Sequence, residues 1–336
     1  MARKARKDMR SRLIERLKVL LSYLQQLFSR PAASQNSPAH APKASVLSTP
    51  SPFRNILPVG SWDSHMHIID PVRFPLSADA LYTPSPYTLS QCRLFESSVS
   101  LDNIVIVQPS IYGNDNSCLL EALRELGPNR ARGVVSFEPR SVSLSTLEEW
   151  HALGVRGVRV NFSSVGKTLD AEELGDLLES YAVDVCQMEG WVLQVYMPMA
   201  MMTLLEQIVP RLKGVRVCVD HMGHPSLPIP GGSSNPYDIA GFQSLVNLLR
   251  SGNAFVKFSA PYRLTDDVSY LEPVGRELLR VAGNDKLVFA TDWPHTRFEG
   301  LDIQPWMQTV IGWCEDEGVQ VERLFKTNAE DLWSVE

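Results

Sequence analysis

The chain has 336 residues, of which 44% are hydrophobic and 21% are charged, an ordinary composition for a globular protein. Its net charge of −6 is unevenly spread, because residues 1–43 carry ten Lys or Arg against two acidic residues (10 − 2 = +8), which leaves −6 − 8 = −14 for the remainder. An acidic body argues against nucleic-acid binding. No apolar run reaches the ~20 residues that span a bilayer.

The five cysteines are odd in number, are widely spread and include no CxxC pair. This pattern argues against a disulfide framework and against a thiolate metal site. A reducing compartment fits such a chain, so we expect a cytoplasmic protein, with a mitochondrial location as the alternative.

The N-terminal segment "RSRLIERLKVLLSYLQQLF" repeats leucines at helical spacing and carries basic residues at the other positions. These charges interrupt the apolar stretch that a secretory signal needs. Three interpretations stay open: a mitochondrial presequence, against which Asp8 and Glu15 count, a membrane-surface contact by residues 1–43, and a mostly disordered extension. A Pro- and Ser-rich linker follows, so we expect a basic helix and linker at 1–54 and a folded domain at 55–336.

Short runs of β-branched and apolar residues then alternate with segments of helical period. The runs are 62–69, 103–110, 132–139, 154–162, 191–198, 215–223, 254–260 and 287–295. Alternating strands and helices predict a parallel sheet, and eight such units predict closure into an α/β fold of the (β/α)8 TIM-barrel type. The chain has no GxGxxG after the first run and no Walker loop, so a nucleotide cofactor lacks support.

Polar residues interrupt the apolar pattern near the C-terminal end of nearly every predicted strand, where barrel enzymes place their chemistry. They include His65, His67, Ser110, Arg159, Tyr196, His221, Arg263, Asp292 and His295. The first two alternate along one strand, so both rings can face the barrel mouth. A single buried histidine is usually a hydrogen-bonded core residue. The coincidence of many polar groups on one rim favours a functional site, because each costs ~1–3 kcal/mol if unsatisfied.

This ordered set, HxH after the first strand, His after the sixth and Asp after the eighth, resembles the amidohydrolase superfamily. The segments "DSHMHIIDPVRFPL", "VQPSIYGNDN", "VDHMGHP" and "FATDWPHT" are similar to the amidohydrolase-related branch that contains 2-pyrone-4,6-dicarboxylate lactonase. The similarity extends over roughly residues 58–335, and "TDWPH" is its most specific part.

The resemblance implies a set of catalytic residues. Asp292 would be the general base that takes a proton from the attacking water. His65, His67 and His221 would surround the substrate carbonyl and stabilise the oxyanion. His295 would lie beside the base.

The resemblance also implies a substrate-binding set. Arg159 and Arg263 would bind substrate carboxylates, Tyr82 and Ser110 would assist them, and Tyr196 matches a family tyrosine. One departure concerns this set: the lactonase has a second arginine six positions beyond the one matching Arg159, and here that position holds a valine.

The residues leave the need for a metal open. His65, His67 and Asp292 could supply the three protein ligands of a divalent metal such as zinc, although the fifth strand offers no histidine. A lactone carbonyl is activated, so an aspartate base and an oxyanion pocket can suffice. We therefore expect no required cofactor, with one divalent metal as the alternative.

Together these patterns predict a hydrolase that opens the lactone of a small carboxylated, aromatic-derived substrate. One alternative is a metal-dependent decarboxylase or amide hydrolase on the same barrel. The other is a non-catalytic barrel scaffold that the basic N-terminal helix recruits to a membrane. The pattern predicts no particular oligomeric state.

Overall fold

The computed structural model describes residues 51–162 and 170–335. Nearly all of the predicted helix and linker at 1–54 lies outside the described residues, as does Val165, which departs from the family pattern. The domain boundary between residues 54 and 55 stays a prediction, although Phe53 is only 1% exposed and already belongs to the core.

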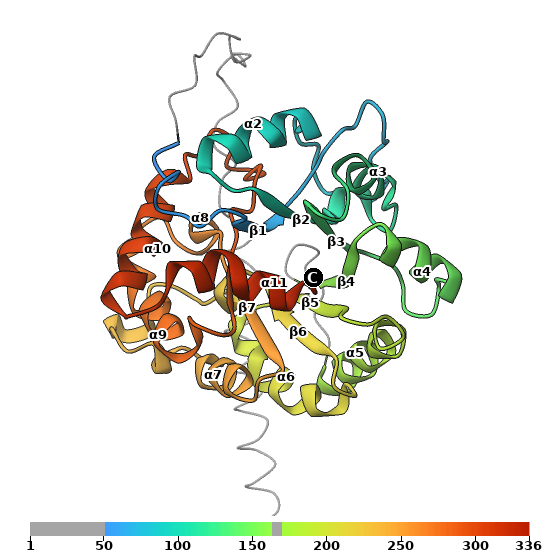
Figure 1. Cartoon of the computed structure of the whole chain (residues 1–336). Coiled ribbons are helices and arrows are strands. Elements are labelled where there is room, and N and C mark those ends of the chain that lie inside the picture. Colours follow the sequence, from blue (N-terminus) through green and yellow to red (C-terminus); the bar gives the residue numbers. More distant parts are fainter. Residues whose placement is uncertain (1–50, 163–169, 336) are drawn as a thin grey trace, which may run out of the picture. The chain divides into compact units, whose positions relative to one another are not determined.

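The described residues form one sheet of eight parallel strands, hydrogen-bonded in chain order. The strands are β1 (Trp62–Met66), β2 (Asn103–Val107), β3 (Ala131–Val135), β4 (Val155–Asn161), β5 (Val192–Tyr196), β6 (Arg216–Val219), β7 (Ala254–Phe258) and β8 (Leu287–Phe289). The two edges meet where His67 N donates to Trp293 O at 2.8 Å and Asp292 N donates to His65 O at 2.9 Å. The predicted (β/α)8 barrel is confirmed (Figure 1).

Helices surround this barrel as an outer layer (Figure 1). They are α2 (Leu89–Val99), α3 (Ser117–Leu126), α4 (Leu144–Ala152), α5 (Ala171–Val185), α6 (Met202–Ile208), α7 (Phe242–Arg250), α8 (Pro261–Leu264), α9 (Glu272–Ala282) and α10 (Gln304–Asp316), whereas α11 (Asn328–Leu332) lies at one end of the barrel. Local sequence sets their ends: the Asp170 side chain accepts from the N–H groups of Glu172 and Glu173, and the Glu173 side chain accepts from Asp170 N. This capping box begins α5, whose apolar face then packs on the sheet.

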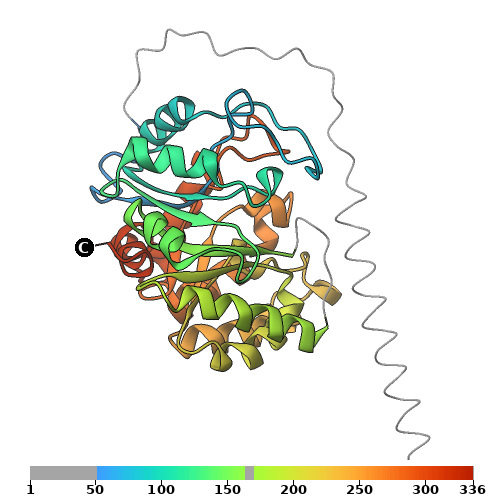
Figure 2. The same ribbon diagram turned by 90° about the vertical axis from the view of Figure 1, so that its right-hand side faces the viewer.

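A compact apolar layer fills the N-terminal end of the barrel interior. It consists of Trp62, Val105, Val107, Val134, Val192, Cys218, Phe255, Val288, Ala329, Leu332 and Trp333. The last three come from α11 and the residue after it, and α11 lies across this end of the barrel (Figures 1 and 2). Trp333 Nε1 donates to Ser64 Oγ on β1 at 3.2 Å. Packing therefore closes this end of the barrel.

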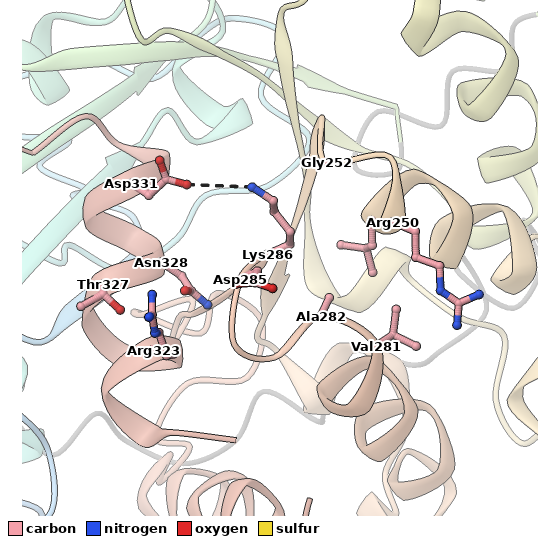
Figure 3. A pocket seen from close by; sticks show the side chains of 11 residues that line it. Arg250, Gly252, Val281, Ala282, Asp285, Lys286, Arg323, Thr327, Asn328 and Asp331 are labelled. Carbon is pink, nitrogen blue, oxygen red and sulfur yellow. Dashed lines mark ion pairs between the residues drawn. The ribbon is translucent and has the colours of Figure 1, made fainter. Parts of the chain in front are cut away.

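A hollow lies beside the closed end, between the C-terminal ends of α7 and α9 and the chain around α11 (Figure 3). Arg250, Arg323 and Asn328 are among the residues that line it, and Lys286 Nζ lies 4.0 Å from Asp331 Oδ2. The hollow is next to the starts of β7 and β8. It is therefore at the opposite end of the barrel from the strand tips, where barrel enzymes carry out chemistry.

Within residues 51–162 and 170–335, no helix combines the length and apolar character needed to cross a bilayer.

Candidate active site

Four of the predicted catalytic residues meet at the C-terminal end of the barrel. Asp292 Oδ1 lies 3.7 Å from His65 Nε2 and 3.6 Å from His67 Nε2. The ring centroids of His65 and His221 are 5.0 Å apart. These side chains come from positions up to 227 residues apart in the sequence (292 − 65), and closure of the barrel brings them together.

The backbone of His65 is held by a buried carboxyl whose contacts the sequence pattern did not reveal. Asp63 Oδ1 accepts from His65 N at 3.1 Å and from Thr291 N at 3.0 Å, and Asp63 Oδ2 accepts from the Thr291 hydroxyl. The pairing of β1 with β2 shifts register between Asp63 and Met66. Asp63 thus joins β1 to the chain after β8, and burial raises the pKa of its carboxyl to about 7.

The backbone of the site is unusual. His221 (φ 50°), Ala260 (φ 52°), Asp292 (φ 64°) and His295 (φ 60°) all adopt left-handed conformations. Such conformations are uncommon outside glycine and cost of order 1–3 kcal/mol each. They lie in the loops that follow β6, β7 and β8, so strained backbone is concentrated where the polar side chains converge.

The two oxygens of Asp292 have different surroundings. Oδ2 accepts from the Tyr262 hydroxyl at 2.7 Å and from Arg263 Nε at 2.5 Å, whereas Oδ1 faces the histidines. Burial raises the pKa of the Asp292 carboxyl, but the nearby Arg263 and His221 lower it further, so the net pKa lies well below its usual value. Asp292 is therefore an ionised carboxylate with one oxygen fixed and the other directed into the site.

Three buried histidines, His65, His221 and His295, favour the neutral form. Burial lowers the pKa of His221 and of His295 to about 4. Burial, followed by the charge of Lys257, holds the pKa of His65 well below its usual value. A neutral ring donates a hydrogen bond from one nitrogen and accepts at the other, so the tautomer decides what each histidine can do.

One tautomer follows directly from a contact. His67 Nδ1 lies 2.7 Å from Val107 O, a carbonyl that can only accept, so Nδ1 carries the proton. His67 Nε2 lies 3.6 Å from Asp292 Oδ1, so a water molecule or a cation could lie between these two atoms. His221 Nδ1 lies 2.8 Å from Ser259 Oγ, which can donate or accept.

Both predicted carboxylate-binding arginines are paired with buried aspartates in the structure. Arg159 Nε and Nη2 lie 3.1 Å and 3.0 Å from Asp220 Oδ2, and Arg263 Nε lies 2.5 Å from Asp292 Oδ2. Neither of these contacts with Asp220 uses Nη1 of Arg159. Arg263 orients Asp292 in this arrangement.

Of the other predicted site residues, Tyr196 packs against the histidines, whereas Tyr82 and Ser110 have other surroundings. The Tyr196 ring packs edge-on against His221, with centroids 4.9 Å apart. The Tyr82 hydroxyl lies 3.5 Å from Thr296 Oγ1, next to His295 in sequence. Ser110 begins a 3₁₀ turn, Ser110–Tyr112, and no contact recorded among the described residues joins its side chain to the histidines or to Asp292.

Three side chains below the histidines form a polar layer whose pairing the sequence did not reveal. Gln194 Nε2 donates to Asp220 Oδ1 at 2.8 Å, and Lys257 Nζ donates to Gln194 Oε1 at 2.7 Å. His65 Nδ1 lies 3.3 Å from both Lys257 Nζ and Asp220 Oδ1. The available signal was the lone cation in the apolar run "AFVKFSA".

Charged side chains are concentrated around the histidines. Three cations, Arg159, Lys257 and Arg263, accompany the carboxylates Asp220 and Asp292, and a third carboxyl, Asp63, has a pKa raised to about 7 by burial. Burial raises the pKa of Asp220, but His65, Arg159 and Lys257 lower it further, so that carboxylate also stays ionised. With Lys257 protonated, the sum is 3 − 2 = +1 when Asp63 is protonated and 3 − 3 = 0 when it is ionised, so protonation of Asp63 favours an anionic ligand.

The site residues also fit one divalent metal. Donor atoms of His65, His221 and Asp292 lie within 4.8 Å of one another. His65 Nε2 is buried without a hydrogen-bond partner among the described residues. Two ligands on a tetrahedral zinc are about 3.3 Å apart, close to the 3.6–3.7 Å that separate Asp292 Oδ1 from the Nε2 atoms of His65 and His67. The predicted metal ligands were His65, His67 and Asp292. In the structure, the donor atoms that lie within 4.8 Å of one another belong to His65, His221 and Asp292.

The sequence model of the amidohydrolase family matches residues 62–335. The chain belongs to this family. The match confirms the resemblance carried by the HxH, His and Asp motifs, and it agrees with the barrel and with the convergence of these residues at the strand tips.

Relatives of this amidohydrolase-family chain include enzymes named for lactone substrates. It is 29% identical over 261 residues to 4-sulfomuconolactone hydrolase of Hydrogenophaga intermedia, covering 76% of this chain and 81% of that one. It is 29% identical over 252 residues to 2-pyrone-4,6-dicarboxylate hydrolase of Comamonas testosteroni, with coverages of 71% and 78%. The structure of a putative 2-pyrone-4,6-dicarboxylic acid hydrolase from Pseudomonas putida matches with a TM-score of 0.64 and 27% identity, covering 83% and 99% of the two chains.

Proposed function

We propose that this amidohydrolase-family member is a hydrolase that opens the lactone ring of a small, carboxylated, aromatic-derived substrate. The observation that carries the proposal is Asp292: an ionised, buried carboxylate with one oxygen held by Arg263 and the other facing the rings of His65 and His67. The relatives named above as lactone hydrolases, whose substrate names include carboxylate and sulfo groups, support the substrate class.

Asp292 acts as the general base in this proposal. Oδ1 accepts a proton from a water molecule as the water oxygen bonds to the lactone carbonyl carbon. A low pKa makes a weak base, so the rate depends on positioning, which Tyr262 and Arg263 provide by fixing Oδ2. His67 Nε2 lies 3.6 Å from Oδ1, close enough to contact the same water.

The carbonyl oxygen gains negative charge as the water adds, and it needs hydrogen-bond donors. His65 Nε2 has no partner among the described residues, and the His221 ring lies beside it, so we assign these two rings to the oxyanion pocket. When the tetrahedral intermediate collapses, the ring C–O bond breaks. The proton that Asp292 accepted then passes to the leaving oxygen, which yields the hydroxy acid or its tautomer.

The substrate carboxylate lies against the positive side of the site in this proposal. The Nη1 edge of Arg159 is the proposed contact, and Tyr196, beneath the guanidinium at 5.5 Å, forms the adjacent wall. Tyr82 and His295 would line the opposite rim. Arginine suits the task because its planar guanidinium matches a carboxylate.

A metal is not required in this proposal, although the residues fit one. His65, His221 and Asp292 would hold it, with His67 close by. A bound divalent ion would polarise the carbonyl and lower the pKa of a bound water. The same trio is the one observation that favours the alternative, a metal-dependent decarboxylase or amide hydrolase.

The cellular compartment of the enzyme stays a prediction. We propose a cytoplasmic enzyme, with mitochondria as the alternative. The predicted contact with a membrane surface involves residues 1–43, which lie outside the part of the chain that the structure describes.

The proposal is tested by a panel of carboxylated and sulfonated lactones, with amide and decarboxylation substrates of similar size as comparison. The purified full chain is assayed for ring opening by the change in ultraviolet absorbance, with and without prior chelator treatment. We expect turnover of at least one anionic lactone that survives chelation. Activity confined to the amide or decarboxylation substrates and abolished by chelator would contradict it.

A further inference from the structure

Lys257 is a fully buried cation that the proposed reaction does not use. It lies on the inner face of β7, one layer above Phe255, and its side chain is 0% exposed. Its ammonium lies 5.2 Å above the Trp333 ring, so the apolar layer is below it and His65 is above it. A lysine in this position must satisfy its donors inside the barrel.

Counting donors and acceptors suggests how it does so. The ammonium has three N–H groups. One donates to Gln194 Oε1 at 2.7 Å, and Asp220 Oδ1 is 3.7 Å away. The remaining near atom is His65 Nδ1, at 3.3 Å. If this nitrogen carried a proton, two N–H groups would face each other, so Lys257 is best satisfied when His65 Nδ1 is an acceptor.

Asp220 does not need the histidine proton. Its Oδ1 accepts from Gln194 Nε2 at 2.8 Å, and its Oδ2 accepts from Arg159 Nε at 3.1 Å and pairs with Nη2 at 3.0 Å. Although Asp220 Oδ1 is also 3.3 Å from His65 Nδ1, the carboxylate is already supplied with donors. Among the described residues, the next acceptor beside Lys257 Nζ after Gln194 Oε1 and His65 Nδ1 is Asp220 Oδ1, and at 3.7 Å it is beyond hydrogen-bond length.

We propose that Lys257 is a positioning residue that keeps the His65 proton on Nε2. His65 then presents a hydrogen-bond donor toward the site, as an oxyanion pocket requires. It is also a poor metal ligand in this state, because the nitrogen that faces His221 and Asp292 has no lone pair. Without Lys257, Asp220 would accept a proton from Nδ1, and the carboxylate–histidine pair would present Nε2 as a metal ligand.

The decisive variant is Lys257→Met, which keeps the length of the side chain and removes the donor. Chelator-treated full chain is titrated with Zn²⁺ alone in equilibrium dialysis. We expect zinc affinity to rise by about tenfold or more, while metal-free turnover falls through kcat more than through KM. An unchanged or weaker zinc affinity in the folded variant would overturn the proposal.

Lys286→Met is the matched control. It removes the same charge from the chain, but Lys286 precedes β8, at the opposite end of the barrel from the strand tips, and its Nζ lies 4.0 Å from Asp331 Oδ2 (Figure 3). We expect unchanged zinc affinity and unchanged turnover. A rise in zinc affinity equal to that of Lys257→Met would show a general charge effect and overturn the positioning role.

A second measurement needs no variant of Lys257, which covers the case in which that variant fails to fold. Proton–nitrogen correlation spectra of the metal-free chain, with ¹⁵N-labelled histidines, report the tautomer of each ring, and His65→Gln assigns the His65 signals. We expect the proton on Nε2, and a proton on Nδ1 would overturn the proposal. Neither this readout nor zinc affinity requires the substrate, so its failure is distinguishable from failure of the proposed lactone hydrolysis, on which only the kcat prediction rests.

Discussion

The two ends of the barrel interior differ in chemistry and in backbone geometry. The N-terminal end is apolar and tightly filled, with Leu332 and Trp333 closing it from α11. The C-terminal end holds the cations Arg159, Lys257 and Arg263, the ionised carboxylates Asp220 and Asp292, the carboxyl of Asp63 and several histidines. Left-handed residues such as His221 and Asp292 are concentrated in the loops at that end.

This difference indicates that one end of the barrel mainly stabilises the fold and that the other end holds the groups for chemistry. Buried polar groups and left-handed backbone cost free energy, and they persist only where the surrounding structure holds them. Apolar burial at the other end supplies stability without taking part in chemistry. Substitutions at the N-terminal end should therefore change stability alone, and substitutions at the C-terminal end should change activity first.

The largest difference between the effect on stability and the effect on turnover is expected at the apolar end. Leu332→Ala leaves a cavity in the barrel interior, so we expect a loss of about 3 kcal/mol in the free energy of unfolding. Turnover of the folded variant should stay within twofold of the unaltered chain. Urea unfolding and initial rates below the transition measure the two quantities. A large fall in kcat with unchanged stability would break the comparison.

Arg159→Met tests the polar end. We expect kcat/KM for a carboxylated lactone to fall on the order of 10- to 100-fold, which corresponds to the ~1.5–3 kcal/mol of a charge-assisted hydrogen bond. The loss should be much smaller for the methyl ester of the same substrate. If ester and acid lose equally, Arg159 does not bind the carboxylate.

Arg156→Met is the control for this variant, because it removes the same charge from the same strand. Arg156 Nη1 donates to His151 O at 2.9 Å, at the start of β4 and away from the histidine cluster. We expect its kcat/KM to stay within twofold of the unaltered chain. An equal loss in both variants would mean that total charge, and not the position of Arg159, governs binding.

The smallest effect is expected from pH. Asp292 has a pKa well below its usual value, and burial lowers the pKa of His221 to about 4, so neither changes charge between pH 5 and 7. We expect these two groups to change kcat/KM by less than about twofold over that range and to lower it only as pH approaches 4. A limb between pH 6 and 7 would instead assign the rate to another group, such as Asp63, whose pKa is raised to about 7.

The same depressed pKa values have a consequence for stability with a defined sign. The unfolded chain binds protons at its histidines below about pH 6.5, whereas His221 and His295 resist protonation in the fold until about pH 4. These two residues therefore reduce stability as pH falls through that window. Asp63, whose raised pKa of about 7 favours the protonated folded form, acts in the opposite direction.

Much of this site could be predicted from the sequence, because the hydrophobic periodicity reveals the strands and the positions of polar residues at the strand ends reveal the site. Strand runs mark the barrel, and polar residues at their ends mark the rim, so His65, His221 and Asp292 could be placed together. The predicted runs extended past the strands, however: β8 ends at Phe289, and Asp292 lies in a left-handed turn beyond it. Polar residues after a strand look the same in sequence whether they continue it or leave it.

Side-chain pairing could not be predicted in the same way. Lys257 and His65 are 192 residues apart, and Asp63 reaches Thr291 across 228 residues. Such contacts depend on barrel closure and on the register shift within β1, neither of which has a local signal. The pairing of Arg263 with Asp292 was hidden for the same reason, and it adds orientation of Asp292 to the predicted part of Arg263 in binding substrate, which stays a prediction.

The central claim is that Asp292 takes the proton of the attacking water, and Asp292→Asn tests it most directly. The amide keeps the size of the side chain and removes the basic oxygen. We predict a fall in kcat of ~10³-fold or more on an anionic lactone, with the far-ultraviolet circular dichroism spectrum retained. A folded Asp292→Asn variant that opens the lactone at a rate within tenfold of the unaltered chain would contradict the account.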